Sequence, residues 1–486
     1  GSRRPLASTQ AAFAATKGLV MKNQKAPNIV RAESMPEGTP EVPVCIVGGG
    51  SCGLTAAIAL RKAGIDVLVL ERDESGTGSS ALSSGFIPAA ETRLQKSLGI
   101  EDSHQLLIDD VMNKAHGQAP LHLVKAYVSA ATEAIDELET MGLPFEIVDG
   151  FLYPGHTVRR MHTMPEKTGS TLMTRLAQVA NDLGADVLGQ SLVCELWVNA
   201  QDHVLGVGYQ RPDGAVEHLS CDYLLMACNG FGGNTDMVKE LLPEMANAVF
   251  AGHQGNDGTA IQWGRQLGLQ MGDLDAYQGH GSWVTPQGAL MTWAFIMEGG
   301  VQVNNLGKRF NDETGGYSEA AVHVLSQPGS IAWNIFDAPL LELLRTFPDF
   351  RDAEAAGALR TARDVEGLAV IVGCDVATLK ATLDEVRADH TDAMGRSFTR
   401  SLQAPYHAIK VTGALFHTQG GLEVDAHCRV LKTNGQVLDN LYAAGGAARG
   451  VSGRGADGYL AGNGLLSAVG GGWLAAKDIA QKLKVA

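Results

Sequence analysis

The chain has 486 residues, of which 45% are hydrophobic, so it can bury a large core and is long enough for two or three compact units. Its formal net charge is −15, and a body this acidic repels phosphates, which argues against a nucleic-acid partner. The 7 cysteines form no CxxC pair and indicate neither a disulfide framework nor a zinc site, and no apolar run reaches the roughly 18 residues that a membrane span needs.

Residues 1–41 are expected to form a separate N-terminal arm. The stretch from Arg3 to Arg31 is basic, contains Ser, Ala and Thr, and has no acidic residue, which is the composition of an organelle transit peptide. The alternative is an ordered arm that packs on the body. The scattered cysteines fit a reducing compartment, and we therefore expect the protein in the cytoplasm.

The segment after this arm has the pattern of a β-α-β unit. Val42–Val47 is a short apolar run rich in β-branched residues, and Val67–Leu70 is a second apolar run. Between them, apolar residues recur at helical spacing from Leu54 to Ala63. A strand, a helix and a second strand are therefore predicted here.

A GxGxxG motif lies between the first strand and the helix of this unit. Its glycines, Gly48, Gly50 and Gly53, permit a tight turn, a close approach of the backbone to a pyrophosphate, and close packing of the helix on the strand. Glu71 ends the second strand, 23 residues after Gly48, where its carboxylate can accept hydrogen bonds from a ribose. The unit therefore predicts a dinucleotide site.

The rest of the chain continues the α/β pattern. Apolar residues at helical spacing predict three helices, and alternating segments predict strands between them. The helices are expected over 102–114, 121–141 and 170–183, the strands within 187–209 and over 223–227, and a mostly helical region over 332–393.

A second small-residue loop, Gly76–Ile87, follows Glu71 and contains Ser79, Ser80, Ser84 and Gly85. With this loop the chain resembles the fumarate reductase and succinate dehydrogenase flavoprotein family, including 3-ketosteroid dehydrogenases, whose members carry a similar Ser/Gly loop against the isoalloxazine ring. The resemblance implies that the dinucleotide is FAD. Residues 71–89 contain no histidine of the kind that holds a covalent flavin in some members, so noncovalent FAD is expected.

The resemblance recurs in order from about Val42 to Ala476. The segments that carry it are Ala227–Gly232, similar to Ala-Thr-Gly-Gly-Phe-Gly, Gly255–Gly258, similar to a Gly-Asp-Gly turn, Gly307–Phe310, Leu441–Gly445 and Gly462–Leu466. Together with the fingerprint, it implies cofactor contacts from Gly48, Gly50, Gly53, Glu71, Arg72, Ser79, Ser80, Ser84, Gly85, Val193, Ala227, Gly230, Asp257, Gly445, Gly462, Asn463, Leu465 and Leu466.

The resemblance also implies the domain organisation. The fold class is α/β, with a Rossmann-like FAD-binding domain that is interrupted by an inserted α+β capping domain. The FAD-binding domain is expected over residues 42–270 and 406–486, and the capping or substrate domain over residues 271–405.

On the substrate side, the resemblance matches two histidines but neither arginine of the fumarate-reducing branch. His280 and His417 stand at the histidine positions, whereas Tyr317, seven residues after the Gly-Lys-Arg-Phe segment, and Tyr459 stand where fumarate reductases have arginines. Losing both guanidinium groups removes the bidentate recognition that a dicarboxylate needs. The chain is therefore not expected to reduce fumarate.

Tyr317 is the leading acid/base candidate, because 3-ketosteroid dehydrogenases have a tyrosine at this position that accepts a proton or donates a hydrogen bond. We expect its pKa to fall below 10 if His417 or His280 stabilises the phenolate. Two alternatives remain open. Tyr459 or His417 could transfer the proton, or Tyr317 and Tyr459 could only fill space.

Arg159, Arg160, Arg449 and Arg454 could supply a displaced carboxylate site, although surface solvation is the expected role of each. Only one dinucleotide fingerprint is present, and no haem-attachment or iron–sulfur motif accompanies it. An external electron donor or acceptor is therefore expected.

These observations predict an FAD-dependent oxidoreductase. It would move a hydride between flavin N5 and a Cα–Cβ bond activated by a neighbouring carbonyl or carboxyl group. The substrate is expected to be a small apolar molecule with a carbonyl or a single carboxyl group. The alternatives are a flavin oxidase or monooxygenase that acts on a C–N bond or with dioxygen, and a non-catalytic flavin-binding protein.

Overall fold

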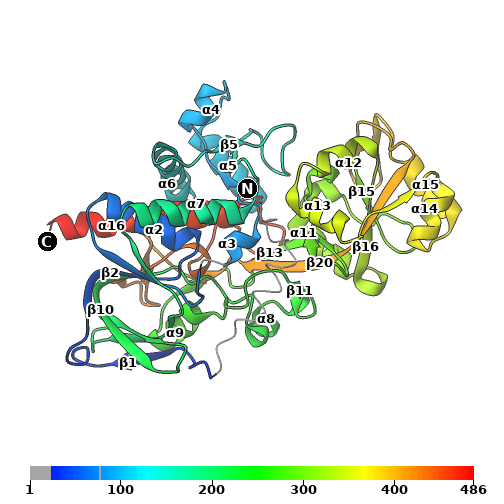
Figure 1. Ribbon diagram of the computed structural model, residues 1–486. Coiled ribbons are helices and arrows are strands. Elements are labelled where there is room, and N and C mark those ends of the chain that lie inside the picture. Colours follow the sequence, from blue (N-terminus) through cyan, green and yellow to red (C-terminus); the bar gives the residue numbers. More distant parts are fainter. Residues whose placement is uncertain (1–22, 76–77, 486) are drawn as a thin grey trace, which may run out of the picture.

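The computed structural model describes residues 23–75 and 78–485, and Figure 1 shows their arrangement. Most of the stretch with transit-peptide composition, and the Gly76–Thr77 pair of the second small-residue loop, lie outside these ranges. Two large sheets organise the described residues. We call the part around the first sheet the Rossmann-like body and the part around the second sheet the capping domain.

The sheet of the Rossmann-like body has nine strands in the order β1-β8-β9-β10-β2-β3-β7, with β23 on β10 and β22 on β23. Neighbours β10, β2, β3 and β7 are parallel. The bounds are β1 (Asn28–Arg31), β2 (Glu41–Val47), β3 (Val67–Leu70), β7 (Asp186–Leu188), β8 (Leu192–Val198), β9 (Val204–Gln210), β10 (Val216–Met226), β22 (Arg429–Leu431) and β23 (Val437–Ala443).

Long helices cover this sheet, and α2, α7 and α16 lie side by side in Figure 1. Helix α2 is buried along its first ten residues, because it is packed between the sheet and its neighbouring helices. The main helices of the body are α2 (Ser51–Lys62), α4 (Arg93–Ser97), α5 (His104–Lys114), α6 (Leu121–Thr140), α7 (Gly169–Asp182), α9 (Thr259–Leu267) and α16 (Asn463–Val485).

The second sheet has seven strands in the order β14-β13-β20-β16-β15, with β11 and β17 also on β20. Helices α12 to α15 gather in a separate lobe, and β20 runs from the body toward it (Figure 1). The bounds are β11 (Val249–Phe250), β13 (Tyr277–Val284), β14 (Ala289–Leu290), β15 (Val301–Val303), β16 (Ile331–Phe336), β17 (Arg360–Ala362), β20 (Tyr406–Thr418), α10 (Ala294–Met297), α11 (Tyr317–Leu325), α12 (Ala338–Leu344), α13 (Pro348–Ala355), α14 (Val365–Val372) and α15 (Val376–Asp384).

This architecture confirms the predicted α/β class with a Rossmann-like body and a separate capping domain. The boundaries expected at residues 41, 270 and 405 stay predictions. Strand β20 begins directly after residue 405 but belongs to the sheet of the capping domain. The expectation of a mostly helical region over 332–393 is wrong at its start, where β16 is a strand. Five of its six residues are buried on both faces, so the strand shows no alternation by which to recognise it.

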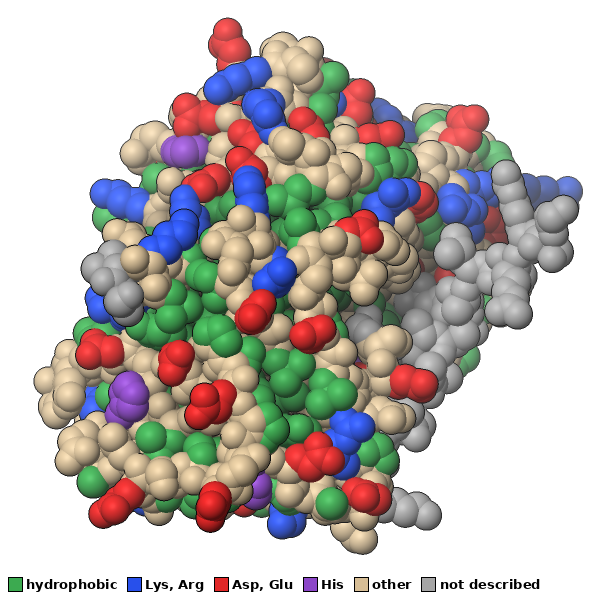
Figure 2. Space-filling model, turned by 60° about the vertical axis from the view of Figure 1, so that its left-hand side comes forward, with side chains coloured by type: hydrophobic (Ala, Val, Ile, Leu, Met, Phe, Trp, Pro, Cys, Tyr) green, Lys and Arg blue, Asp and Glu red, His purple; other side chains and the backbone are tan. Residues whose placement is uncertain are grey.

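Within residues 23–75 and 78–485, no helix combines the length and the apolar character that crossing a bilayer requires. The face drawn in Figure 2 carries acidic and basic side chains close together, with apolar side chains between them. On this face neither sign of charge forms a continuous field.

Arg160 corrects one expectation, because it does not lie at the surface. Its side chain has no exposed area and binds Asp102 of the loop before α5 at 3.0 Å and Asp110 of α5 at 2.5 Å. Asp110 also accepts hydrogen bonds from the amide and hydroxyl of Thr157. This arginine therefore ties the segment before β6 (Met161–Thr163) to α5.

We predict that Arg160→Met destabilises the protein, because it leaves two carboxylates without their buried cation. Removing one partner of a buried pair typically costs about 3–5 kcal/mol of unfolding free energy. Urea unfolding, followed by tryptophan fluorescence, measures the loss. Arg345→Met is the matched control, since Arg345 is half-exposed in its pair with Glu354 and solvent screens such a surface pair, so this variant should lose far less stability. Equal losses in the two variants would contradict the prediction.

Candidate active site

Two cavities meet between the Rossmann-like body and the capping domain. The narrower one lies at the end of β3 and has about 600 Å³, and the wider one has about 1340 Å³, with solvent at the mouths included in both volumes. Both are lined by Gly50, Ala227 and Asn229, so together they form one elongated space. This space runs from Glu71 at one end to Tyr317 at the other.

The three glycines of the fingerprint have different surroundings. A Cβ on Gly48, whose φ is 109°, would overlap the carbonyl of Ala227, and one on Gly53 would overlap the carbonyl of Gly48. A Cβ on Gly50 would point into the cavity and meet only Ser80 Oγ, at 4.0 Å. Gly48 and Gly53 therefore permit close packing, whereas Gly50 keeps the cavity open.

The N-terminus of α2 faces this space without a cap. Its N-cap residue is Gly50, which offers no side-chain hydrogen bond, so amides of the first turn remain available to a phosphate. The carboxylate of Glu71 accepts hydrogen bonds from the amides of Gly49 at 2.7 Å and Asp73 at 3.1 Å. Burial raises the pKa of Glu71, and these two amides oppose the rise.

Other predicted cofactor residues close the narrower cavity. Arg72 donates to the carbonyl of Gly255 at 2.7 Å and lies 3.5 Å from Asp257, whose other oxygen accepts from Thr259 at the start of α9. Val193 lines the same wall.

His253 also lines the narrower cavity, and the sequence analysis missed it. It pairs with buried Asp73 at 2.6 Å, and its Nδ1 accepts from the amide of Gly255 at 2.8 Å. Its position two residues before the Gly-Asn-Asp-Gly turn was the available signal. Asp73 is 180 residues away in sequence, so the pair becomes visible only in the fold.

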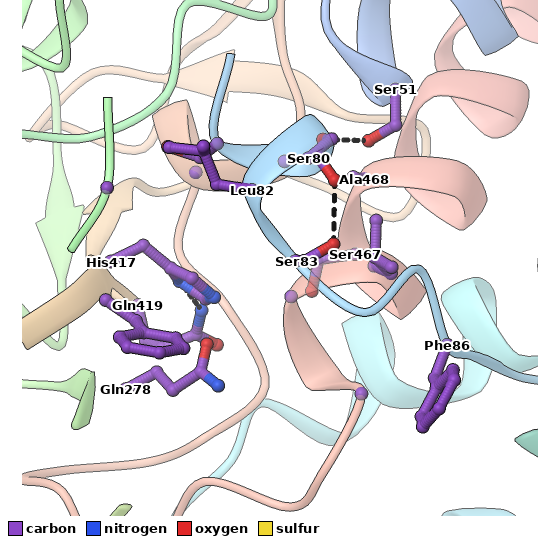
Figure 3. Close-up of a pocket in the computed structure, with 18 of the residues that line it drawn as sticks. Ser51, Ser80, Leu82, Ser83, Phe86, Gln278, His417, Gln419, Ser467 and Ala468 are labelled. Carbon is purple, nitrogen blue, oxygen red and sulfur yellow. Dashed lines mark hydrogen bonds between the residues drawn. The ribbon is translucent and has the colours of Figure 1, made fainter. Parts of the chain in front are cut away.

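Residues 78–87, the described part of the second small-residue loop, form one side of the wider cavity, as Figure 3 shows; we call them the serine loop. Ser80 Oγ lies 2.7 Å from Ser51 Oγ of α2, and Ser83 Oγ donates to the Ser80 carbonyl at 2.7 Å. Ser79 Oγ accepts from Asn256 at 2.8 Å. Predicted residues Ser79, Ser80, Ser84 and Gly85 all line this cavity.

The start of α16 forms a neighbouring part of the wall. Gly445, Gly462 and Leu465 line it, as does Gly230. Three predicted contacts lie behind the wall instead: Gly53, Asn463 and Leu466 are buried and support it.

The residues present fit FAD. The space is elongated, the start of α2 is open to a pyrophosphate, and the serine loop and α16 face the wide part. Ser467 Oγ, in the first turns of α16, lines the wider cavity, is buried and has no hydrogen-bond partner among the described residues. Buried polar atoms normally have partners, and a flavin with its carbonyl and N–H groups would supply them.

The four residues proposed for catalysis meet at the far end of the wider cavity. The rings of Tyr317 and His280 stack with centroids 4.5 Å apart. The ring centroid of Tyr459 lies 6.2 Å from that of Tyr317 and 5.7 Å from that of His417. Tyr153, which the sequence analysis missed, packs edge-on against Tyr317. Its hydroxyl oxygen lies 3.2 Å from Thr292 Oγ1.

A β-bulge brings His417 to this site. Gln278 of β13 pairs with His417 of β20, but the next residue, Gly279, pairs with Leu415, so Phe416 is left as an extra residue. Successive residues of a regular strand point to opposite faces. At this bulge both Phe416 and His417 line the cavity.

A hydrogen bond fixes the protonation of His417. Gln419 Nε2 lies 2.9 Å from His417 Nδ1 (Figure 3). Gln419 Oε1 accepts from Ser452 at 2.8 Å. Nδ1 also lies 3.4 Å from the Thr418 carbonyl, but the Gln419 contact is the shorter one. Because an amide nitrogen only donates, this contact has Nδ1 accepting and places the proton of the neutral ring on Nε2. Burial lowers the pKa of His417 to about 4 and that of His280 to about 3, so both rings are neutral near pH 7.

The expected fall in the pKa of Tyr317 is wrong. Enclosure, and then the neighbouring Tyr459, raise the pKa of Tyr317 well above its usual value, and a hydrogen bond with Gln278 opposes the rise only in part. Neither histidine is charged near pH 7, so neither supplies the positive charge that would lower the pKa of a neighbouring phenol. Tyr317 is therefore a neutral phenol that can donate a proton or a hydrogen bond.

Charged side chains are missing from this part of the site. Among the residues that the structure describes, none that lines the wider cavity is Arg, Lys, Asp or Glu. Arg159 pairs with Asp149, Arg449 with Asp273 and Glu423, and Arg454 with Asp275. With Arg160 buried elsewhere, none of these four arginines lines either cavity.

Comparisons with known proteins agree with this geometry. The FAD binding domain family matches residues 43–465. A probable fumarate reductase of Shewanella frigidimarina is 28% identical over 418 residues, which cover 84% of this chain and 70% of that protein.

Two solved structures are also similar. The open conformation of a flavocytochrome c3 fumarate reductase has a TM-score of 0.76 and 27% identity, and covers 91% of this chain and 79% of its own. A 3-ketosteroid-Δ4-(5α)-dehydrogenase of Rhodococcus jostii RHA1 has a TM-score of 0.72 and 24% identity, covers 93% of this chain and 100% of its own, and shares the fold.

The family match extends over most of the chain, from the fingerprint to the start of α16, and includes both ends of the cavity described above. This chain therefore belongs to the FAD binding domain family, and it is an FAD-dependent oxidoreductase.

Proposed function

We propose that the chain transfers a hydride to or from a Cα–Cβ bond next to a carbonyl group, in an apolar substrate without a second carboxylate. The absence of charge from the described wall of the wider cavity carries this proposal. A dicarboxylate would lose its hydration there without gaining a cation, which is strongly unfavourable. The relative named a fumarate reductase therefore differs from this chain in its proposed substrate.

FAD held by the fingerprint, the serine loop and α16 would supply hydride chemistry at N5. The protein's own task is to orient the carbonyl and to handle one proton. His417, with its proton on Nε2, can donate a hydrogen bond to the substrate carbonyl as negative charge develops there. The Tyr459 hydroxyl accepts from the amide of Gly464 at 3.2 Å, which leaves its own proton available for the same oxygen.

Tyr317 has the protonated state that reduction of an activated double bond requires. Its raised pKa keeps the phenol neutral, so it can give its proton to Cα when the carbonyl is held by the other donors. Oxidation would need the phenolate, which this enclosed site disfavours. The arrangement thus favours reduction, with electrons from an external donor, because the single dinucleotide fingerprint serves FAD.

FAD should be bound without a covalent link, because residues 71–89 contain no histidine to which a flavin could be attached. We expect the purified protein to be yellow and to release intact FAD when it is denatured by acid or heat. Separating the supernatant from the precipitated polypeptide tests this. Flavin that stays with the polypeptide would contradict it.

Glu71→Ala should weaken FAD binding, since it removes the carboxylate at the ribose end of the cavity. A charge-assisted hydrogen bond contributes about 1.5–3 kcal/mol, so the dissociation constant should rise by roughly one to two orders of magnitude. Titration of the apoprotein, followed by flavin fluorescence, measures this. Glu71→Gln, which keeps one acceptor oxygen for Gly49, should lose less. An unchanged dissociation constant in Glu71→Ala would remove this residue from the site.

Tyr317→Phe tests the proposed proton transfer, because it keeps the ring that stacks on His280 and deletes the hydroxyl. General acids contribute about 10²- to 10⁴-fold, so reoxidation of the reduced enzyme by a cyclic enone without oxygen should slow by that order. Flavin content and enone affinity should change little. Stopped-flow absorbance measures the single turnover.

Two results would count against this assignment. A rate within about threefold of wild type is far below the effect of a general acid and would exclude Tyr317 as the proton donor. A wild-type enzyme that reacts with dioxygen but is inert to enones would indicate a flavin oxidase instead.

A further inference from the structure

The C-terminal end of α5, in the Rossmann-like body, reaches the start of α11, in the capping domain. Lys114, the last residue of α5, donates to the carbonyl of Gly315 at 2.7 Å and to the carboxylate of Glu319 at 2.6 Å. These two groups stand on either side of Tyr317 in the chain. One ammonium group of the body therefore holds both flanks of the segment that carries the proposed proton donor.

This contact is largely shielded from solvent. The side chain of Lys114 is 12% exposed and that of Glu319 is 18% exposed. Burial raises the pKa of Glu319, whereas Lys114 is the largest influence that lowers it. The other oxygen of Glu319 has no hydrogen-bond partner among the described residues. Lys114 is therefore the main group that stabilises the ionised carboxylate of Glu319.

The turn before Tyr317 is shaped around this ion pair. Gly316 has φ 144° and ψ 159°, a conformation that is open essentially to glycine alone. A Cβ there would overlap Glu319 Oε1 and lie 3.2 Å from Lys114 Nζ. Gly316 is also the N-cap of α11 and gives no side-chain hydrogen bond. The helix start therefore lacks a cap of its own and is held from the other domain.

The same end of α5 supports the segment that carries Tyr459. A Cβ on Gly453 would lie 3.1 Å from the carbonyl oxygen of Ala115, and a Cβ on Gly458 would lie 3.5 Å from Ala115 Cα. Both tyrosines of the site are therefore placed by neighbouring residues at one helix end.

We propose that Lys114 is a positioning residue. By binding Gly315 and Glu319 it couples the position of the Tyr317 hydroxyl to the contact between the capping domain and the Rossmann-like body. This inference rests on the proposed role of Tyr317. It predicts that losing the ammonium group misplaces the phenol while the other residues of the cavity wall stay in place, because Lys114 lines neither cavity. A misplacement of about 1 Å can slow a reaction by about 10²-fold.

Lys114→Met tests this, because it keeps most of the side-chain stem and removes the charge. The first readout needs no turnover. Hydrogen–deuterium exchange of the peptide that spans residues 313–325 should become faster in Lys114→Met. The matched control is Lys477→Met, since Lys477 pairs with Glu133 on the surface of the body, with 52% and 46% exposure. This control should leave the exchange of that peptide unchanged.

The second readout is the anaerobic single-turnover rate with a cyclic enone. Lys114→Met should slow it by about tenfold or more when Tyr317 is present, and should have no further effect in the Tyr317→Phe background. If Lys114→Met loses its flavin, Glu319→Gln, which keeps the side-chain volume, takes its place in both measurements. It should give the same pattern, because it removes the charge from the other side of the pair.

Unchanged exchange of residues 313–325 would overturn the positioning role of Lys114. Equal slowing by Lys114→Met with and without the Tyr317 hydroxyl would overturn it as well, since the effect would then not pass through Tyr317. Failure of the proposed function is seen elsewhere, in a Tyr317→Phe variant that reacts at the wild-type rate.

Discussion

The site depends on the contact between the start of α2 and the end of β2, where a Cβ on Gly53 would overlap the carbonyl of Gly48. This closeness lets the helix begin directly at the sheet, with its free amides facing the cavity. Strand β2 pairs with β3 on one side and with β10 on the other, so Glu71 and Ala227, which follow those two strands, both line the narrower cavity. Even a single added methyl group at Gly53 would separate these parts.

At the other end of the cavity, enclosure sets the protonation states. It raises the pKa of Tyr317 and lowers those of His280 and His417, so acid and bases alike are neutral. The ion pairs of the described residues lie outside the wall of the wider cavity, as the contact of Lys114 with Glu319 does. Charge therefore holds the framework, while neutral donors face the substrate, which is a coherent arrangement for a ligand that carries a carbonyl and little charge.

Local patterns made much of this predictable. The fingerprint and Glu71 lie within one β-α-β unit, and ordered family motifs indicated that Tyr317 and both histidines would meet. Features that depend on distant segments were not accessible: His253 needs Asp73, and Lys114 meets Glu319 across two domains. The pKa of Tyr317 was predicted in the wrong direction, because a sequence lists possible neighbours but not how completely they exclude water. Strand β16 was missed since burial on both faces removes its periodicity.

The bulge in β20 has a consequence for how such a pocket can diverge. On a regular strand, neighbouring side chains point to opposite faces of the sheet. A substitution therefore changes the chemistry of a side chain but not the face to which it points. Phe416 is an additional residue in the pairing with β13, and it sits directly beside His417. Deleting one residue there would restore the alternation and turn one of these two rings away from the cavity. In this strand, a change of length therefore alters which side chains line the cavity, as a change of residue type does.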